Sequence, residues 1–263
     1  MQAEADRARR CFVSASRFKV IFQRDLADYR ERTRDLAAAA WPEFMRHDPI
    51  ANENWHELFD RFEEYQFALW DTENSLMAAM GNSLPFYWEH PFEELPERGW
   101  DWVFLKAVED HRSGVTPNTQ SAIQIAIHPE YQGQRLSTQM IRVMAGIGSS
   151  NGFRYLVAPV RPNQKSQYPL IGIDDYITWT NEETLPFDAW LRVHVRAGAR
   201  IVKPCHEAMT VVGTCAEWEA WTGLKFMQSG KYYIAGALNP MEMNVEKDQG
   251  VYVEPNVWMV HTL

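Results

Sequence analysis

Residues 121–137 read SAIQIAIHPEYQGQRLS, and this stretch decides the fold class. Isoleucines alternate with other residues from Ile123 to Ile127, which is the period of a β-strand with one buried face. A turn that contains Gly133 follows, and the apolar positions after Ser137 repeat at helical spacing. The order strand, tight turn and helix is typical of an α/β unit.

The turn between this strand and this helix has the chemistry of an anion-binding site. Backbone N–H groups converge at the start of a helix, and the helix dipole adds to their attraction for a phosphate. Gly133 gives the backbone freedom to turn, and Arg135 offers a planar guanidinium that suits a phosphate. The alternative is a plain strand-to-helix turn, because one degenerate loop motif is weak evidence.

Composition excludes several classes of protein. The 263 residues are 46% hydrophobic, which is enough for a sizeable core and excludes general disorder. No run approaches the ~20 apolar residues of a membrane span, so no membrane association is expected. The acidic start of the chain lacks the apolar stretch of a secretion signal, so the expected location is the cytoplasm.

Charge and cysteine content exclude other partners. Asp and Glu outnumber Lys and Arg by 35 to 26, and a net charge of -9 disfavours nucleic acid. The three cysteines are scattered, and neither Cys-x-x-Cys nor His-x-x-x-His spacing occurs, so no metal site is expected.

Local patterns predict further elements on both sides of the decisive stretch. Residues 83–102 are rich in Trp and Pro and are expected to form a long loop with a functional role. The tail after residue 226 is rich in turn residues and is expected to form a cap. The expected strands cover residues 18–22, 75–80, 102–108, 121–127, 153–160, 200–203 and 209–213. The expected helices cover residues 25–44, 54–68, 188–199 and 215–222, besides the one after Ser137.

The decisive stretch resembles the pyrophosphate loop of the GNAT acyltransferase superfamily. Its family pattern is Arg/Gln-x-x-Gly-x-Gly/Ala, and here the loop runs from Gln132 to Ser137 after a Pro-Glu-Tyr. Arg135 stands where the family usually has Gly, and Ser137 where it has Gly or Ala. Two later positions also match: Asn163 follows a buried strand, and His194 lies four residues before Gly198, where the family often has Tyr.

The resemblance implies an α/β (α+β) fold. It consists of a GNAT-like mixed central sheet, splayed between strands 4 and 5, with helices on both faces and an added C-terminal cap. The implied organisation is an N-terminal extension (1–17), a GNAT-like domain (18–225) and a C-terminal extension packed on that domain (226–263). The implied ligand is acyl-coenzyme A, or the phosphopantetheine arm of a carrier protein, with no metal.

The resemblance also assigns site residues. The backbone near Ile127 would polarise the thioester carbonyl, and Asn163 would hold the pantetheine arm. The pyrophosphate would contact Gln132, Gly133, Gln134, Arg135, Leu136 and Ser137. His194 would protonate the leaving thiolate, since histidine has an unperturbed pKa of ~6.5. The alternative for His194 is a satisfied core histidine on an apolar helix face.

Other candidates lie around this centre. Glu207 is a candidate base for the acceptor, and Trp55 a candidate wall of the acyl pocket. Arg161 and Arg192 are candidates to bind an acidic substrate or a carrier-bound acyl group. A carrier-protein donor further predicts a basic patch that includes Arg135, Arg142, Arg161 and Lys165.

The extended form of the chain resembles a GNAT subgroup of natural-product pathways, the loading domains of polyketide synthases. The favoured function is acyl transfer from a coenzyme A or carrier thioester to a small amine or thiol acceptor. The first alternative is a malonyl- or methylmalonyl-thioester decarboxylase that passes its acyl group to a carrier protein. That subgroup pairs a His with a Thr on the fifth strand, and residues 154–160 contain no Thr. The second alternative is a non-catalytic acyl-CoA or carrier-binding module.

Overall fold

The computed structural model describes residues 17–263, so the expected N-terminal extension lies outside it except for Arg17. The strands are β1 (Phe18–Phe22), β2 (Gln66–Asp71), β3 (Leu76–Phe86), β4 (Thr119–Ile127), β5 (Tyr155–Val160), β6 (Arg200–Gly213), β7 (Gly230–Tyr232), β8 (Met241–Asn244) and β9 (Gln249–Thr262). The helices are α2 (Tyr29–Ala40), α3 (Pro49–Asp60), α4 (Gly99–Arg112), α5 (Leu136–Ser150), α6 (Ile173–Tyr176), α7 (Ala189–Arg196) and α8 (Cys215–Thr222).

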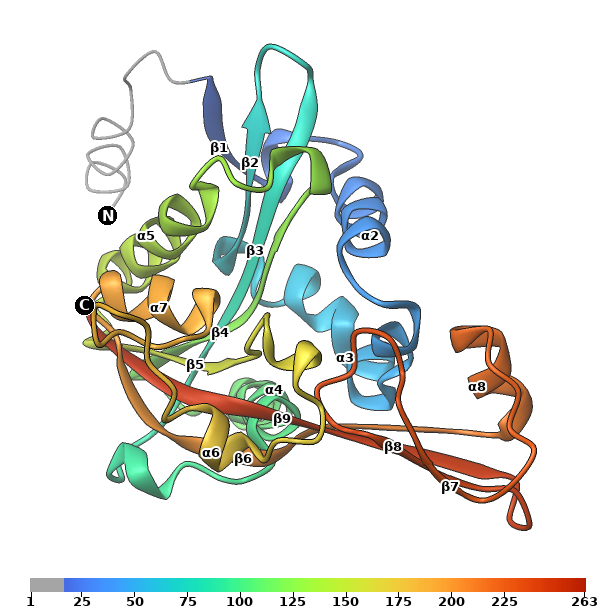
Figure 1. Cartoon of the computed structure of the whole chain (residues 1–263). Coiled ribbons are helices and arrows are strands. Elements are labelled where there is room, and N and C mark those ends of the chain that lie inside the picture. The colour runs from blue at the N-terminus through green and yellow to red at the C-terminus, as the bar shows by residue number, and fades with distance from the viewer. Residues whose placement is uncertain (1–16) are drawn as a thin grey trace.

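All nine strands belong to one mixed sheet, which organises this part of the chain (Figure 1). The strand order is β1-β2-β3-β4-β5-β9-β8-β7, and β6 also pairs with β9. Only β4 and β5 run parallel among these pairs, and every other pair is antiparallel.

The sheet is splayed between β4 and β5, as the sequence predicted. Their pairing consists of Gln120 with Leu156 and Ser121 with Val157 only. Beyond these pairs β4 continues along β3 as far as Ile127, while β5 continues along β9. Each strand thus follows its antiparallel neighbour, and the edges that face each other separate.

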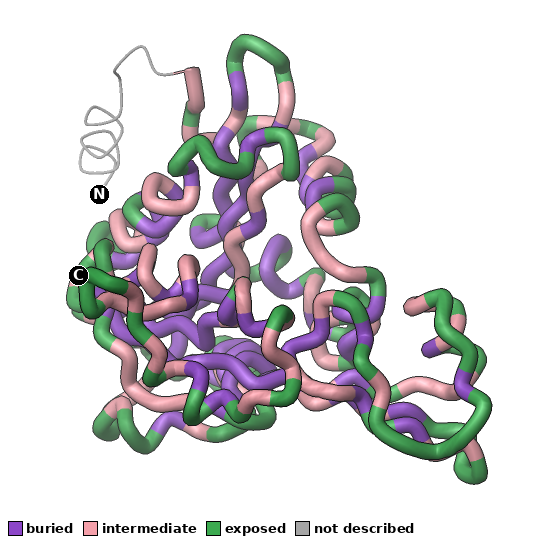
Figure 2. The backbone as a smooth tube through the Cα atoms, viewed as in Figure 1, coloured by how far each residue is buried: buried purple, intermediate pink, exposed green. Residues whose placement is uncertain are grey.

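Helices cover both faces of the sheet, which confirms the expected layers (Figure 1). α2, α3 and α4 pack on one face around Leu58, Trp100 and Phe104. α5 and α7 pack on the other face, with Met140 and Leu191 among the buried side chains. The central strands are buried along most of their length, and the exposed residues gather in connecting loops (Figure 2).

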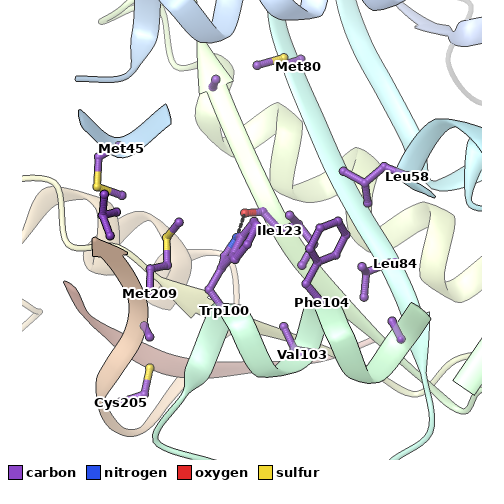
Figure 3. Packing of buried hydrophobic residues seen from close by; sticks show 14 of the residues in the cluster. Met45, Leu58, Met80, Leu84, Trp100, Val103, Phe104, Ile123, Cys205 and Met209 are labelled. Carbon is purple, nitrogen blue, oxygen red and sulfur yellow. Dashed lines mark hydrogen bonds between the residues drawn. The ribbon is translucent and has the colours of Figure 1, made fainter. Parts of the chain in front are cut away.

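Trp100 joins a helix to the strand that borders the splay. Its indole N–H donates to the carbonyl of Ile123 at 2.9 Å, and Phe104 lies beside it in the same cluster (Figure 3). The bond satisfies a buried indole N–H and fixes α4 against β4.

Several predicted elements were wrong in type or extent. Residues 102–108 belong to α4 and not to a strand, because the buried positions Val103, Phe104, Ala107 and Val108 have helical spacing. The helix expected to reach Ala68 ends at Asp60, and β2 begins at Gln66. The strand expected over residues 75–80 continues to Phe86, which shortens the expected loop.

The C-terminal segment differs from the expected cap. β9 lies inside the sheet between β5 and β6, and residues 254–261 are all buried. The two strands expected over residues 200–203 and 209–213 are one strand, β6, with an irregularity between Cys205 and Met209. β7, β8 and α8 extend away from the main body together with the adjoining ends of β6 and β9 (Figure 1).

Candidate active site

A cavity of about 900 Å³ opens at the splay between β4 and β5. One side is formed by β4 and the other by the end of β5 and the loop after it. α2, α3 and α7 contribute the remaining walls. The predicted site residues that line it are Trp55, Ile127, Gln132, Gly133, Ser137, Arg161, Asn163 and His194.

The loop from Gln132 to Ser137 presents free main-chain donors to this cavity. Gly133 has φ +78° and Arg135 has φ +60°, and α5 begins at the next residue, Leu136. Within residues 17–263, the N–H groups from Gly133 to Ser137 donate to no main-chain oxygen. Such amides at the start of a long helix suit a diphosphate.

Tyr131 anchors this loop to the β2–β3 turn. Its hydroxyl donates to the carboxylate of Asp71 at 2.7 Å. Asp71 also accepts from Arg17 at 2.6 Å and from the main-chain N–H of Glu73 at 2.9 Å. Arg17, Tyr131 and these N–H groups hold the pKa of Asp71 well below its usual range, so the anchor stays charged.

His194 projects from α7 to the cavity wall and is otherwise enclosed. Its Nδ1 lies 3.0 Å from Nε2 of His261 on β9, and the Trp190 ring stands edge-on at 4.4 Å. Burial, together with the neighbouring His261, lowers the pKa of His194 to about 3. At neutral pH the imidazole is therefore neutral and has one nitrogen able to accept a proton.

The helix that carries His194 is tied to the loop that carries Asn163. Asp188 caps α7 by accepting from Trp190 N at 2.9 Å, and its other oxygen accepts from Gln164 N at 2.8 Å. Asn163 is exposed at the cavity edge beside this link. The cap thus sets the position of His194 relative to the expected pantetheine contact.

Trp55 forms part of an aromatic wall. Its ring stacks on Trp100 with centroids 6.4 Å apart and an interplanar angle of 14°. Both rings border the cavity, and Trp55 is half-buried. An apolar wall at this place suits an acyl group.

Five predicted residues lie outside the cavity lining. Glu207 is exposed at the irregularity of β6, and Arg192 donates to the carbonyl of Phe187 at 2.8 Å. Gln134 and Arg135 are exposed on the outer side of the loop. Leu136, the fifth such residue, is buried beneath α5 and offers only its main chain.

Arg161 borders the cavity but is already paired. Its Nε donates to Glu254 at 2.8 Å and its Nη2 to the carbonyl of Gly236 at 2.5 Å. Burial lowers the pKa of Arg161, but the charge of Glu254 more than offsets this, so the pair is ionic. Tyr252 donates to the other Glu254 oxygen at 2.8 Å. Glu254 and His261, both on β9, are the site residues that sequence reasoning missed.

The four residues expected in a basic patch do not form one. Arg135 and Arg142 are exposed. Lys165 is fully buried, where its Nζ donates to the carbonyls of Tyr168 and Leu238 at 3.0 and 2.7 Å. Since Arg161 is only partly exposed and is held in its ion pair, the predicted patch was wrong in two of its four members.

Two further properties concern residues 17–263 only. In this range no three His, Cys, Asp or Glu side chains are grouped so as to hold a metal ion. No helix within it has the length and apolar character needed to cross a bilayer.

The splayed mixed sheet, with free amides at the start of the helix after β4, is the arrangement that the resemblance to the GNAT superfamily implied. The chain is similar in structure to the loading GNATL domain of CurA from Lyngbya majuscula, with a TM-score of 0.62, 18% identity, and coverage of 94% and 98% of the two chains. It is also similar to the GphF GNAT-like decarboxylase in complex with isobutyryl-CoA, with a TM-score of 0.56, 12% identity, and coverage of 93% and 98%. These likenesses confirm the resemblance in fold.

In sequence, the chain is 29% identical over 252 residues to an arginine N-acetyltransferase of Aspergillus versicolor. The match covers 86% of each chain. No family model matches this sequence.

Proposed function

We propose that this protein transfers an acyl group from acyl-coenzyme A to a small amine. One observation carries the proposal: unpaired loop amides and a neutral, buried histidine border the same cavity at the splay of the sheet. The first feature suits the diphosphate of coenzyme A, and the second suits proton transfer at the reacting thioester.

The reaction needs one proton to move from nitrogen to sulfur. The amine nitrogen attacks the thioester carbonyl, its C–N bond forms, and the C–S bond then breaks. In our proposal Nε2 of His194 accepts the proton from the amine nitrogen and returns it to the departing thiolate. Main-chain N–H groups at the open edge of β4 would stabilise the negative oxygen that develops in between. Asn163 would hold the pantetheine arm.

Coenzyme A is the donor and an amine the acceptor that the observations favour. The ion pair of Arg161 with Glu254 and the burial of Lys165 weaken the case for docking of an acidic carrier protein. The relative from Aspergillus versicolor is named for acetyl transfer to arginine, so an amino-acid amine is the acceptor class to test first.

Decarboxylation is the second candidate, because one similar structure is titled a decarboxylase. That reaction needs a donor for the enolate oxygen that forms as carbon dioxide leaves. On β5 the residues that border the splay are Ala158, Pro159 and Val160, and none has a hydroxyl. We therefore expect thioester transfer without loss of carbon dioxide.

The test combines acetyl-CoA or malonyl-CoA with arginine and other amino acids, and measures thiol release, carbon dioxide and product mass. Thiol release with an acylated amine is the expected result. Carbon dioxide release from malonyl-CoA would favour the second candidate. Binding of acetyl-CoA without thiol release would indicate that the protein is a non-catalytic binding module.

The same assay tests His194. His194→Gln should lower kcat ~10²-fold or more, the usual contribution of a positioned general base. His90→Gln is the matched control, because His90 is exposed and does not border the cavity. An unchanged kcat in His194→Gln with an intact fold would show that the role of His194 is structural and not catalytic.

A further inference from the structure

Two histidines meet inside the protein, although 67 positions separate them in the sequence. His194 is 3% exposed on α7 and borders the cavity, while His261 is 3% exposed on β9 and does not. The rings lie 5.2 Å apart between centroids, with Nδ1 of His194 3.0 Å from Nε2 of His261. This distance is a hydrogen bond, so one of the two nitrogens carries the shared proton.

The surroundings of His261 decide which nitrogen carries it. Burial lowers the pKa of His261, and an interaction with the main chain of Ala197 opposes this effect. A main-chain group that raises a histidine pKa is a carbonyl, which accepts an N–H from the ring. Because Nε2 of His261 faces His194, Nδ1 is the ring nitrogen that is left to interact with the Ala197 carbonyl. Nε2 of a neutral His261 is then an acceptor, and Nδ1–H of His194 is the donor.

We propose that His261 is a positioning residue that holds His194 in the Nδ1–H form, with the lone pair of Nε2 directed to the cavity. The proposal rests on the proposed function, in which that lone pair accepts the proton of the acceptor amine. Within residues 17–263, Nε2 of His194 has no hydrogen-bond partner. Neutral imidazole exchanges its two tautomers freely unless a partner selects one. The contact with His261 therefore sets the fraction of His194 that is in the Nδ1–H tautomer and can act as a base through Nε2.

The proton path is balanced without a further reactant. The lone pair of His194 Nε2 accepts the amine proton while Nδ1–H stays bonded to His261, and the resulting imidazolium gives the Nε2 proton to the thiolate. His261 remains neutral throughout. It touches neither substrate nor thioester, and its effect is exerted through the orientation and tautomer of His194.

Nitrogen-15 NMR of the intact protein tests the tautomer directly. The wild-type spectrum should show His194 protonated at Nδ1 and His261 protonated at Nδ1, both neutral at pH 7. An N–H on Nε2 of His194 would overturn the proposal. This readout needs no acyl acceptor, so it is independent of the proposed function.

Two substitutions at the same position test the consequence for catalysis. His261→Gln places an amide oxygen where Nε2 stood and preserves an acceptor, whereas His261→Leu removes it. We expect His261→Leu to lower kcat ~10²-fold, with KM for acyl-CoA nearly unchanged. Without the acceptor, His194 can carry its proton on Nε2, and in that tautomer it cannot accept the proton of the amine. His261→Gln should recover at least part of this loss and keep His194 in the Nδ1–H form.

Thr262→Val is the matched control, because Thr262 is exposed at the end of the same strand. Full kcat in His261→Leu with unchanged KM would overturn the proposal. Equal losses in the Gln and Leu variants, with a shifted KM, would also overturn it, since that pattern is one of general structural damage. If the wild type acylates no amine, the proposed function fails, and the NMR spectrum alone then decides the role of His261 as a tautomer-selecting residue.

Discussion

Arg135 adopts a backbone conformation that most residues avoid. Its φ of +60° and ψ of +18° place it in the left-handed region, immediately before α5. Glycine adopts this region freely, which gives a physical reason for the Gly usual at this place in GNAT loops. The guanidinium is exposed and lies on the outer side of the loop. The effect of the backbone conformation of Arg135 and the effect of its charge can therefore be measured separately.

Two substitutions separate them. Arg135→Gly and Arg135→Ala both remove the guanidinium, but only Ala retains a Cβ in the left-handed region. We expect the Gly variant to be more stable than the Ala variant by about 0.5–1 kcal/mol, measured by urea unfolding. If the guanidinium assists phosphate binding, KM for acetyl-CoA should rise equally in both variants. A rise in only one variant would show that backbone shape, and not charge, governs binding.

From the sequence, the predicted site residues that the structure brings to one cavity are those that depend on local spacing. Gly133 and Ser137 lie on one turn, and His194 is fixed by its distance from the helix-ending Gly198. The sequence did not identify Glu254 or His261, which reach the site from β9. Contacts between residues this far apart depend on strand pairing, and no local pattern encodes that pairing.

At the scale of elements, the phosphate loop depends on the β2–β3 turn. Tyr131 is buried in the short helical turn before the loop and is bonded to Asp71 across 60 positions. Only Gln132 separates it from Gly133, so movement of Tyr131 would displace the first of the free loop amides. The loop is therefore held at one end by the bond between Tyr131 and Asp71 and at the other end by α5.

Tyr131→Phe tests this support with minimal change in volume. Loss of the hydroxyl leaves Asp71 bound to Arg17 but frees the loop, so we expect KM for acetyl-CoA to rise about 3- to 10-fold, equivalent to roughly 1 kcal/mol for one hydrogen bond. kcat should change little, because His194 is held by α7. Tyr87→Phe is the control, since Tyr87 bonds to Glu89 away from the cavity. A fall in kcat with an unchanged KM would contradict the proposed role of the loop.

Elements were predicted best where one periodicity dominates. The alternation from Ile123 to Ile127 correctly predicted β4, and the apolar spacing after Ser137 correctly predicted α5. Residues 102–108 were misassigned because a short apolar window fits a strand as well as a buried helix. Its helical character becomes clear only over the full length of α4, from Gly99 to Arg112.

At the scale of the whole molecule, β9 joins the two halves of the sheet. It pairs with β5 beside the splay and with β8 farther along the same edge, and it pairs with β6 on its other edge. The same strand brings Glu254 and His261 to the site. Because turn residues such as Asn256 and Pro255 interrupt its apolar pattern, local reasoning predicted a cap where the structure has a buried strand.

Two carboxyl groups inside the core make stability depend on pH. Asp48 caps α3 and is fully buried, and Asp101 is 3% exposed in the first turn of α4. One oxygen of each has no hydrogen-bond partner. Burial raises the pKa of Asp101 to about 8, with the charge of Asp48 adding to the effect, and burial raises the pKa of Asp48 to about 6.

Asp101→Asn removes the group with the higher pKa. An unfolded Asp loses its proton near pH ~3.9, so between that pH and about 8 the folded protein holds a proton that the unfolded chain has released. The free energy of unfolding of the wild type should therefore fall as pH rises through this window. Asparagine does not titrate, so the stability of the variant relative to the wild type should rise by about 3.5 kcal/mol between pH 5 and pH 8, at about 1.4 kcal/mol per pH unit. Urea unfolding at several pH values measures the difference, with the exposed Asp35→Asn as control. A constant difference across the range would mean that Asp101 is already ionised in the core, and the buried pair would then need a cation that balances its charge.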